Sequence, residues 1–326
     1  MHVVIVGLGS IGRRHATNVA TVRPDARLTF VRHHGGEDDF ARRLRARVVG
    51  SIDDVELTSC DLAILATPSD RHVDALPTLI RAGCPLMIEK PVVTDLDDCD
   101  TIESLLAESP PARRTVGFNL RYLPSLRRVR DLIDAGRLGR IVRASFTAGQ
   151  WLPSWRPDVD YRTVYSAASI AGGGVELDLA HEFDIARWWL GDLAPLFAAA
   201  GTFSGLDIST SDTATSVLVP PGGRAPLVTV TLDYVARPRI RRYEVVGDAG
   251  TVQWSVDGSL RVETDDGSID ESFDDDGFDV GATYRTMLEA MLAPADGARW
   301  PSVQSVEDGL ATTRLALAVR RLGAAA

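Results

Sequence analysis

One lysine stands out among the residues whose types suit chemistry. Lys90 is the only lysine in 326 residues, and the other 34 basic residues are arginines. Arginine keeps its charge, whereas lysine offers a compact amine that can lose its proton when its surroundings demand it. Glu89 and Pro91 flank it, and proline fixes φ and removes an amide, so the turn is stiff. Either Lys90 survived an arginine-favouring codon bias by chance, or it is a catalytic residue.

A glycine-rich turn near the N-terminus is the second chemical signal. Gly7, Gly9 and Gly12 form a G-x-G-x-x-G pattern between an apolar run at residues 3–6 and a predicted helix at 13–20. The first glycine permits a tight turn, the second lets amides approach a pyrophosphate, and the third allows close helix–strand packing. Ser10 and Ile11 would lie at the helix N-terminus, which favours an anion. The pattern predicts a dinucleotide site, with a plain turn as the alternative.

The end of the next predicted strand, at residues 28–31, bears on which dinucleotide is bound. An acidic residue about 20 positions after the last glycine holds the ribose 2′-hydroxyl of NAD. Arg32 occupies that region, and the first carboxylate after it is Glu37. An arginine there can meet the 2′-phosphate of NADP, so we expect NADP to be favoured over NAD. The alternative is that Arg32 lies on the adenine or faces solvent.

Two further strands deliver loops to the same edge of the predicted sheet. The runs at 61–66 and 86–88 predict buried strands, with a helix at 70–82 between them. Thr67 and Pro68 end the first strand, while Glu89 and Lys90 end the second. In parallel sheets ligands bind beyond the carboxyl ends of the strands. The pattern predicts a doubly wound α/β domain over residues 1–118.

Strands cluster in the remainder of the chain, residues 119–326. A helix at 125–135 precedes β-rich runs at 141–150, 213–219, 227–235, 240–246, 251–256 and 260–263. Helices are expected again at 284–292 and 303–322. Strands grouped after a helical section predict an α+β domain with an open, mostly antiparallel sheet.

Two segments of this second domain carry candidate site residues. Asp178 and His181 share one face of a helix expected at 175–190, because residues three apart are neighbours on a helix. An N-terminal cap and a core histidine are the alternatives. Earlier, a loop contains four residues suited to a sugar or an anion: Trp151, Arg156, Tyr161 and Arg162. A rigid Trp/Pro loop that only packs is equally compatible with this pattern.

The composition restricts the partners. The net charge is −10 and the pI is near 5.1, which makes nucleic acid or an anionic membrane a poor partner. No apolar run is long enough to span a membrane. The three cysteines lack metal-ligand spacing, so a reduced cytoplasmic protein is expected. The acidic stretch at 265–279 predicts a solvated hairpin or surface loop, and no metal site is expected.

Taken together, these motifs resemble the glucose-fructose oxidoreductase / inositol dehydrogenase / MocA (Gfo/Idh/MocA) family of NAD(P)-dependent oxidoreductases. The resemblance rests on 7-GLGSIGRRH-15, Thr67-Pro68, Glu89-Lys90-Pro91, 117-GFNLRY-122, and the glycines at 172–174 with Asp178 and His181. It implies an N-terminal Rossmann domain and a C-terminal sheet domain that makes a homodimer or homotetramer. The implied cofactor-binding residues are Gly7, Gly9, Ser10, Ile11, Gly12, Arg32, Thr67, Pro68, His72, Glu89 and Lys90. The implied substrate-binding residues are Asn119, Arg121, Trp151, Arg156, Tyr161 and Arg162.

The resemblance implies hydride transfer between nicotinamide C4 and a hydroxyl-bearing carbon of a sugar, amino-sugar or cyclitol. Lys90 would stabilise the reacting oxygen, His181 would transfer the proton, and Asp178 would hold a neighbouring hydroxyl. The family usually has the histidine four residues after the aspartate, where this chain has Glu182, so His181 is one residue early. Alternatives are a redox-assisted glycoside hydrolase with tightly bound NAD, or a cofactor-sensing regulator without catalysis.

Overall fold

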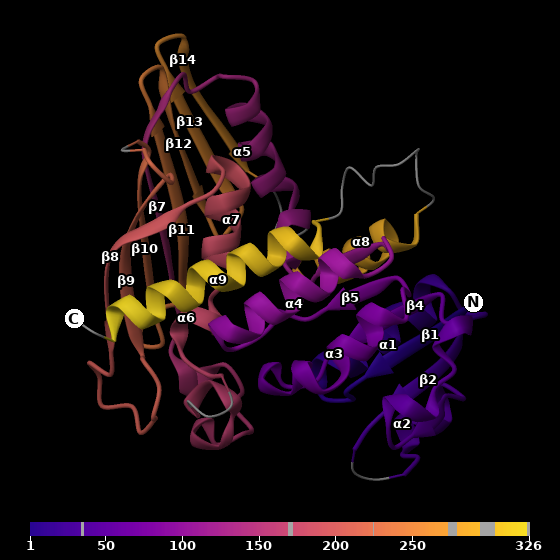
Figure 1. Ribbon diagram of the computed structural model, residues 1–326. Coiled ribbons are helices and arrows are strands. Elements are labelled where there is room, and N and C mark those ends of the chain that lie inside the picture. Colours follow the sequence, from indigo (N-terminus) through magenta and orange to yellow (C-terminus); the bar gives the residue numbers. More distant parts are fainter. Residues whose placement is uncertain (34–35, 169–171, 224, 273–278, 294–303, 325–326) are drawn as a thin grey trace. The chain divides into compact units, whose positions relative to one another are not determined.

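The computed structural model describes residues 1–326 apart from 34–35, 169–171, 224, 273–278, 294–303 and 325–326. The chain divides into two compact units (Figure 1). The first comprises Met1–Phe118 with Tyr284–Thr313, and the second comprises Asn119–Thr283 with Arg314–Ala326. We expected a single division between residues 118 and 119, so Tyr284–Thr313 departs from that expectation.

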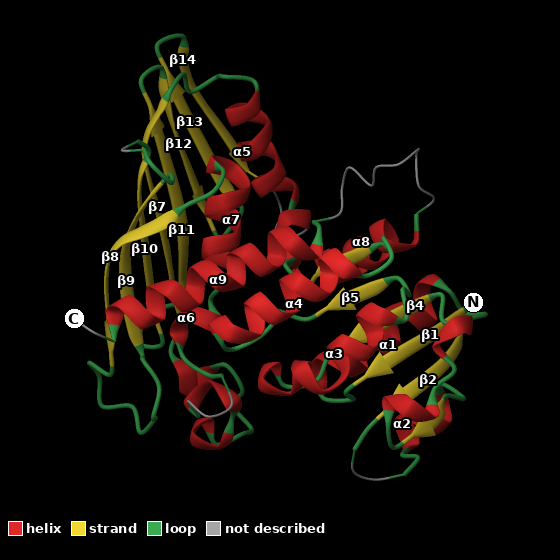
Figure 2. Ribbon diagram, viewed as in Figure 1, coloured by secondary structure: helices red, strands yellow, loops and turns green. Residues whose placement is uncertain are grey.

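Six parallel strands form the sheet of the first unit, in the order β3-β2-β1-β4-β5-β6. Figure 2 labels β2, β1, β4 and β5 of this sheet. They are β1 (His2–Val6), β2 (Arg27–Val31), β3 (Arg47–Val49), β4 (Leu62–Leu65), β5 (Leu86–Ile88) and β6 (Arg114–Val116). β1 and β4 are buried along their whole length, as expected when helices cover both faces of a parallel sheet. The strand order reverses between β1 and β4, which makes their carboxyl ends the natural ligand site of such a sheet.

Amphipathic helices connect these strands. They are α1 (Ser10–Val22), α2 (Asp39–Arg43), α3 (His72–Arg81) and α4 (Leu96–Glu108), and most of α8 (Val280–Leu292) and the first part of α9 (Val306–Gly323) also belong to this unit. In α4 the side chains of Cys99, Ile102 and Leu106 are buried, at the spacing of one helix face.

Three contacts explain why Tyr284–Thr313 joins the first unit. The ring of Tyr284 meets the imidazole of His15 edge-on, with 5.7 Å between ring centroids. The Val92 amide donates a hydrogen bond of 3.2 Å to the hydroxyl of Thr313. Gly309 of α9 lies so close to Val116 that a Cβ built on this glycine would be 2.3 Å from the valine side chain. Such long-range packing leaves no local sequence signal.

The second unit is built on an eight-stranded sheet in the order β14-β13-β12-β11-β7-β10-β9-β8. Its strands are β7 (Ile141–Gly149), β8 (Ala194–Gly201), β9 (Thr213–Val219), β10 (Leu227–Asp233), β11 (Ile240–Gly247), β12 (Gly250–Ser255), β13 (Ser259–Thr264) and β14 (Gly267–Ser272). Among the described strands of this sheet, only β7 and β10 pair in parallel. The sheet is therefore mostly antiparallel, which confirms the predicted fold class.

Helices cover one face of this sheet (Figure 1). They are α5 (Pro124–Asp134), α6 (Val175–Asp178) and α7 (His181–Leu190), together with the end of α9. The aromatic core under α7 contains Tyr243, which stacks on Trp254 with centroids 4.7 Å apart and lies 5.1 Å from Phe146. The buried indole of Trp254 donates to the hydroxyl of Ser125 on α5, so its polar atom is satisfied.

Several elements differ from the sequence-based expectations. The helix expected at 175–190 is two helices, α6 and α7, separated at Leu179 and Ala180. β8 and the short elements α2 and β3 were not anticipated, and neither were α4 and β6. The acidic stretch includes β14, which forms a hairpin with β13, while residues 273–278 lie outside the described residues.

Among the residues that the structure describes, no helix is long and apolar enough to cross a membrane. The three cysteines, Cys60, Cys84 and Cys99, are buried and form no disulfide bond with one another. In the described ranges no three His, Cys, Asp or Glu side chains gather in a way that would hold a metal ion.

A glycine at the end of β11 generates a stability prediction. A Cβ on Gly247 would lie 1.9 Å from the carbonyl oxygen of Leu138, at the point where the register of β11 and β7 shifts. Gly247→Ala should therefore lower the free energy of unfolding by about 1–3 kcal/mol, the usual cost of overpacking. Urea unfolding followed by circular dichroism measures this. Gly205→Ala is the matched control, since a Cβ there meets nothing within 4 Å. Equal stability of the two variants would contradict the close approach.

Candidate active site

The glycine loop joins β1 to α1 through very close backbone packing. Gly7 has φ of +93°, and a Cβ on it would lie 2.6 Å from the Ala66 carbonyl oxygen. A Cβ on Gly12 would lie 2.1 Å from the Gly7 carbonyl oxygen. At Gly9, in contrast, a Cβ would meet no described atom within 4 Å. The first and third glycines thus serve packing, while the second leaves room for a ligand to approach the backbone.

The start of α1 is suited to an anion. Gly9 is the N-cap residue, and within the described part of the chain no side chain caps this terminus by a hydrogen bond. The first turn, which contains Ser10 and Ile11, has no acidic residue that would compete for the amides. Exposed amides and the helix dipole both favour a phosphate at such a terminus.

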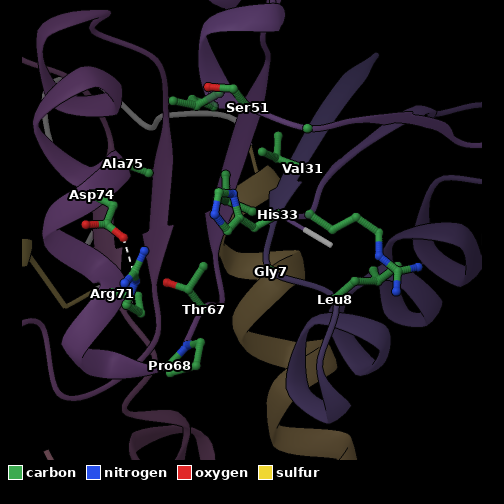
Figure 3. Close-up of a pocket in the computed structure, with 14 residues that line it drawn as sticks. Gly7, Leu8, Val31, His33, Ser51, Thr67, Pro68, Arg71, Asp74 and Ala75 are labelled. Carbon is green, nitrogen blue, oxygen red and sulfur yellow. Dashed lines mark ion pairs between the residues drawn. The ribbon is translucent and has the colours of Figure 1, made fainter. Parts of the chain in front are cut away.

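A cavity of about 810 Å³ lies at the carboxyl edge of the parallel sheet (Figure 3). It falls within the usual size of small-molecule sites. Its wall combines residues from the ends of β1, β2 and β4 and from the segment after β3: Val6, Gly7, Leu8, Val31, Arg32, His33, Gly50, Ser51, Ile52, Thr67, Pro68, Arg71, Asp74 and Ala75. Arg71 and Asp74 form an ion pair of 2.7 Å at its rim. The predicted residues Arg32, Thr67 and Pro68 are brought together here.

In the cavity wall, Arg32 forms an ion pair with Asp38. Its Nη1 donates to Asp38 Oδ2 at 2.9 Å, and Arg13 Nη2 donates to the same oxygen at 2.6 Å. The other carboxylate oxygen of Asp38 accepts the Ala41 amide at 2.9 Å and caps α2. The Ala41 amide and the two guanidinium groups hold the pKa of the Asp38 carboxyl well below its usual range. Arg32 therefore faces the cavity as one member of an ion cluster.

His72 is buried behind the cavity rather than in its wall. Its Nδ1 lies 3.0 Å from the Val92 carbonyl oxygen and its Nε2 lies 3.2 Å from the Thr67 carbonyl oxygen. Burial lowers the pKa of this imidazole, and the nearby carbonyls and the Glu89 charge only partly oppose that. His72 links the loop after β4 to the segment after Lys90, so its predicted contribution to cofactor binding is indirect.

Glu89 is also buried, with its carboxylate aimed back into the unit. Glu89 Oε1 lies 2.6 Å from His15 Nε2 on α1, and neither side chain is more than 8% exposed. A Cβ on Gly117 would come within 3.0 Å of the Glu89 carboxylate, so this glycine makes space for it. Lys90 follows directly, is half-buried, and precedes a cis peptide bond to Pro91. The lysine therefore stands at a strand end that buried contacts hold on both sides.

In the second unit, close packing fixes the segment before α6. A Cβ on Gly173 would lie 2.1 Å from the Tyr165 carbonyl oxygen, and Gly174 has φ of +113°. Arg320 of α9 donates to the Gly173 carbonyl oxygen at 2.6 Å and lies 3.6 Å from the buried carboxylate of Glu176. The glycines at 172–174 are thus needed for the backbone path that leads to Asp178.

Asp178 accepts hydrogen bonds from two tyrosines. Tyr165 donates to Oδ1, and Tyr234 donates to Oδ2 at 2.6 Å. Burial, reinforced by the Asp178 carboxylate, raises the pKa of both hydroxyls well above the usual value, so both stay protonated. No local sequence pattern indicates these tyrosines, because they lie 13 and 56 positions from Asp178.

His181 and Glu182 occupy different environments at the start of α7. His181 is half-buried, whereas the Glu182 side chain is fully buried. Glu182 Oε1 lies 2.7 Å from Arg241 Nε and accepts the Tyr243 hydroxyl at 2.7 Å. Burial and the Glu182 charge raise the pKa of Tyr243 well above its usual value. Glu182 is therefore engaged in a buried ion pair.

Several predicted substrate-binding residues are already paired within the second unit. Arg121 makes a bidentate contact to the buried Asp184, with distances of 2.7 and 2.8 Å. Asn119 is buried and donates to the hydroxyl of Thr283 at 2.7 Å. Arg162 binds the exposed Asp160. For these three the contacts observed are structural, and a substrate role stays a prediction.

The Trp/Pro loop contains the remaining predicted residues. The guanidinium of Arg237 lies 3.4 Å from the ring centroid of Trp151. Arg156 and Tyr161 line a small cavity of about 70 Å³ together with Tyr165. Because Tyr165 also binds Asp178, this loop is connected to the predicted catalytic carboxylate within one unit.

Two family models match this chain. The model described as "Oxidoreductase family, NAD-binding Rossmann fold" (GFO_IDH_MocA) covers residues 1–117, and the model "GFO/IDH/MocA C-terminal domain" covers residues 126–253. An inositol 2-dehydrogenase of Rhizobium meliloti is 32% identical over 196 residues, which are 58% of this chain and 54% of that protein. The chain thus spans about half the length of the curated relatives that it matches.

Two solved structures share the fold over nearly the whole chain. A levoglucosan dehydrogenase in complex with NADH and levoglucosan has a TM-score of 0.82 at 18% identity, covering 100% of this chain and 97% of that one. The WlbA dehydrogenase of Bordetella pertussis, in complex with NADH and UDP-GlcNAcA, has a TM-score of 0.78 at 21% identity, covering 99% and 96%.

The buried Glu182 generates a second prediction. Glu182→Gln should lower the free energy of unfolding by about 3–5 kcal/mol, because it leaves the charge of Arg241, whose side chain is only 16% exposed, without its partner. Glu244→Gln is the matched control, since Glu244 pairs with the half-exposed Arg143 on the same sheet and should cost about 1 kcal/mol or less. Chemical denaturation measures both. If Glu182→Gln were no less stable than Glu244→Gln, the ion pair would not be structural.

Proposed function

This chain belongs to the Gfo/Idh/MocA family of oxidoreductases, and on that premise we propose that it is an NAD(P)-dependent dehydrogenase. Its substrate would be a sugar, amino-sugar or cyclitol, and the reacting group a hydroxyl-bearing carbon. The observation that carries this proposal is the arrangement at one edge of the parallel sheet. There the open backbone at Gly9, the free start of α1, the 810 Å³ cavity and the strand end bearing Lys90 all belong to one unit.

The residues of the first unit fit a dinucleotide. Amides of Ser10 and Ile11 at the start of α1 would hold the pyrophosphate, and the cavity walled by Thr67 and Pro68 would take the adenosine. Glu89 and His72 would contribute by holding the surrounding loops. When bound, the dinucleotide supplies the hydride acceptor or donor. Because Arg32 lies in the cavity wall, we propose a modest preference for NADP over NAD, although the levoglucosan dehydrogenase and WlbA structures described above are complexes with NADH.

The protein's own part in the reaction is to orient the substrate and to handle a proton. We assign Lys90 to the reacting oxygen, where its ammonium would stabilise developing alkoxide charge. His181 would act as general base in oxidation and as general acid in reduction, because an imidazole suits proton transfer near neutral pH. Asp178, oriented by two tyrosine hydroxyls, would hold a neighbouring substrate hydroxyl.

The proposed substrate class is supported by the relatives and by the loop that contains Trp151 and Arg156. The relatives are named for inositol and levoglucosan, which are polyhydroxylated rings. The Arg237 guanidinium already lies over one face of the Trp151 ring, so a substrate ring would stack on the other face. Arg156 offers a cationic group that suits polar substituents. Homodimer or homotetramer formation through the second sheet also remains a proposal. Exposed Leu196 and Phe197 on β8 and Leu227 on β10 are consistent with such a contact.

Turnover tests the proposal directly. Purified protein with NAD or NADP should reduce the dinucleotide in the presence of free myo-inositol, scyllo-inositol or levoglucosan, followed by the absorbance of the reduced form. Cleavage of a glycoside without net reduction would instead favour a redox-assisted hydrolase. Dinucleotide binding without turnover on any polyol would favour a sensor.

Lys90→Arg should fold normally and lose most of this activity. The guanidinium is larger and does not give up a proton at neutral pH. Removing one well-placed transition-state donor costs about 100- to 1000-fold in kcat. A lower kcat with an unchanged Kd for the dinucleotide would place the loss in the chemical step. A variant with the turnover of the wild type would exclude Lys90 as a catalytic residue.

His181, not Glu182, should govern the pH dependence. The oxidation rate should rise with pH as the imidazole loses its proton, and this rise should be absent in His181→Asn. Tyr243→Phe and Glu182→Gln, measured where each variant is folded, should keep the rise because Glu182 is held by Arg241 and Tyr243. A pH profile that survives in His181→Asn but vanishes in Glu182→Gln would reverse the assignment.

A further inference from the structure

Asp38 holds two arginines at the edge of the candidate dinucleotide cavity. Its Oδ2 accepts from Arg13 at 2.6 Å and from Arg32 at 2.9 Å, and the three side chains are 38%, 24% and 31% exposed for Arg13, Arg32 and Asp38, respectively. Arg32 lines the cavity. The guanidinium of Arg13 also lies 4.8 Å from the ring centroid of Phe40 on α2, which limits its movement. The three charges thus form one cluster, with a net charge of about +1.

This cluster stands where the family fingerprint places the group that distinguishes NAD from NADP. NADP carries a 2′-phosphate on the adenosine ribose, whereas NAD carries a hydroxyl. Two guanidiniums without a carboxylate would strongly favour a phosphate, because arginine donors match phosphate oxygens. A carboxylate already bound to both arginines offsets their charge and competes for their donors.

We propose that Asp38 is a specificity-determining residue, which holds Arg13 and Arg32 as a clamp and thereby weakens binding of the NADP 2′-phosphate enough for NAD to be used as well. This inference rests on the proposed dinucleotide-dependent function. Arg13 is thus a second potential phosphate ligand beside Arg32. The Asp38 carboxylate occupies the guanidinium donors of both arginines. Asp38 itself binds no cofactor and acts as a positioning residue through the two arginines.

The carboxylate also caps α2 by accepting the Ala41 amide, so its removal has to be separated from loss of that cap. Asn is as good an N-cap as Asp, because its side-chain oxygen accepts the same amide. Asp38→Asn therefore keeps the cap and removes the charge. Asp39→Asn is the matched control. It removes one charge from the next residue, whose side chain is 96% exposed and paired with Arg42.

The experiment compares the Kd values of NADP and NAD by isothermal titration calorimetry for the wild type and both variants. Asp38→Asn should tighten NADP binding relative to NAD by about five- to twentyfold, as expected for releasing two partly exposed ion pairs. The shift should shrink as salt is raised, because the groups are partly exposed. It should also shrink in an Arg32→Ala background. Asp39→Asn should change the ratio by less than about twofold.

The outcomes separate this inference from the proposed function. If Asp38→Asn shifts the ratio no more than Asp39→Asn does, or weakens both dinucleotides equally, the inference is wrong and Asp38 only caps α2. If the wild type binds neither dinucleotide, the proposed function fails and the inference falls with it. A shift toward NADP that is salt-sensitive and is lost in the Arg32→Ala background supports the proposed role of Asp38.

Discussion

The buried contact between His15 and Glu89 is the constraint on which the first unit depends. His15 lies on the helix that follows the glycine loop, and Glu89 directly precedes Lys90. Their 2.6 Å contact ties the candidate pyrophosphate site to the strand end that carries the candidate catalytic amine. Buried polar groups of this kind are costly unless paired, so the pair favours one arrangement of the two elements. Gly117 leaves space for the carboxylate, and Tyr284, which comes from the distant α8, covers the imidazole.

Buried polar contacts also organise the second unit, but there they separate two acidic residues near one another in sequence. Asp178 accepts hydrogen bonds from two tyrosine hydroxyls, while Glu182 forms an ion pair with Arg241 and accepts a hydrogen bond from Tyr243. The half-buried His181 lies between them in the chain and is the group left with suitable chemistry. This division supports assigning proton transfer to His181 even though the family pattern would put the histidine at position 182. In both units a buried carboxylate therefore lies next to the candidate catalytic residue: Glu89 precedes Lys90, and Glu182 follows His181.

Local patterns in the sequence predict a large part of the fold. The glycine loop, the runs that form β1, β2, β4 and β5, and the mostly antiparallel second sheet were all predictable, because hydrophobic periodicity and turn chemistry are local. What these patterns miss depends on distant partners. Ala-rich β8 lacks β-branched residues and is a strand only because β9 pairs with it. The pairing of Arg121 with Asp184 and the engagement of Arg32 by Asp38 likewise arise from tertiary contacts, as does the return of Tyr284–Thr313 to the first unit.

We propose that the His15–Glu89 contact holds one dinucleotide site together with Lys90. A crystal structure of the protein with NADH tests it most directly. We expect the pyrophosphate on the amides of Ser10 and Ile11 and the adenosine in the cavity beside Thr67 and Arg32. The His15–Glu89 contact should be intact, and Lys90 should be directed at the nicotinamide end. A dinucleotide bound elsewhere, or bound here with Lys90 directed away from the nicotinamide, would contradict it.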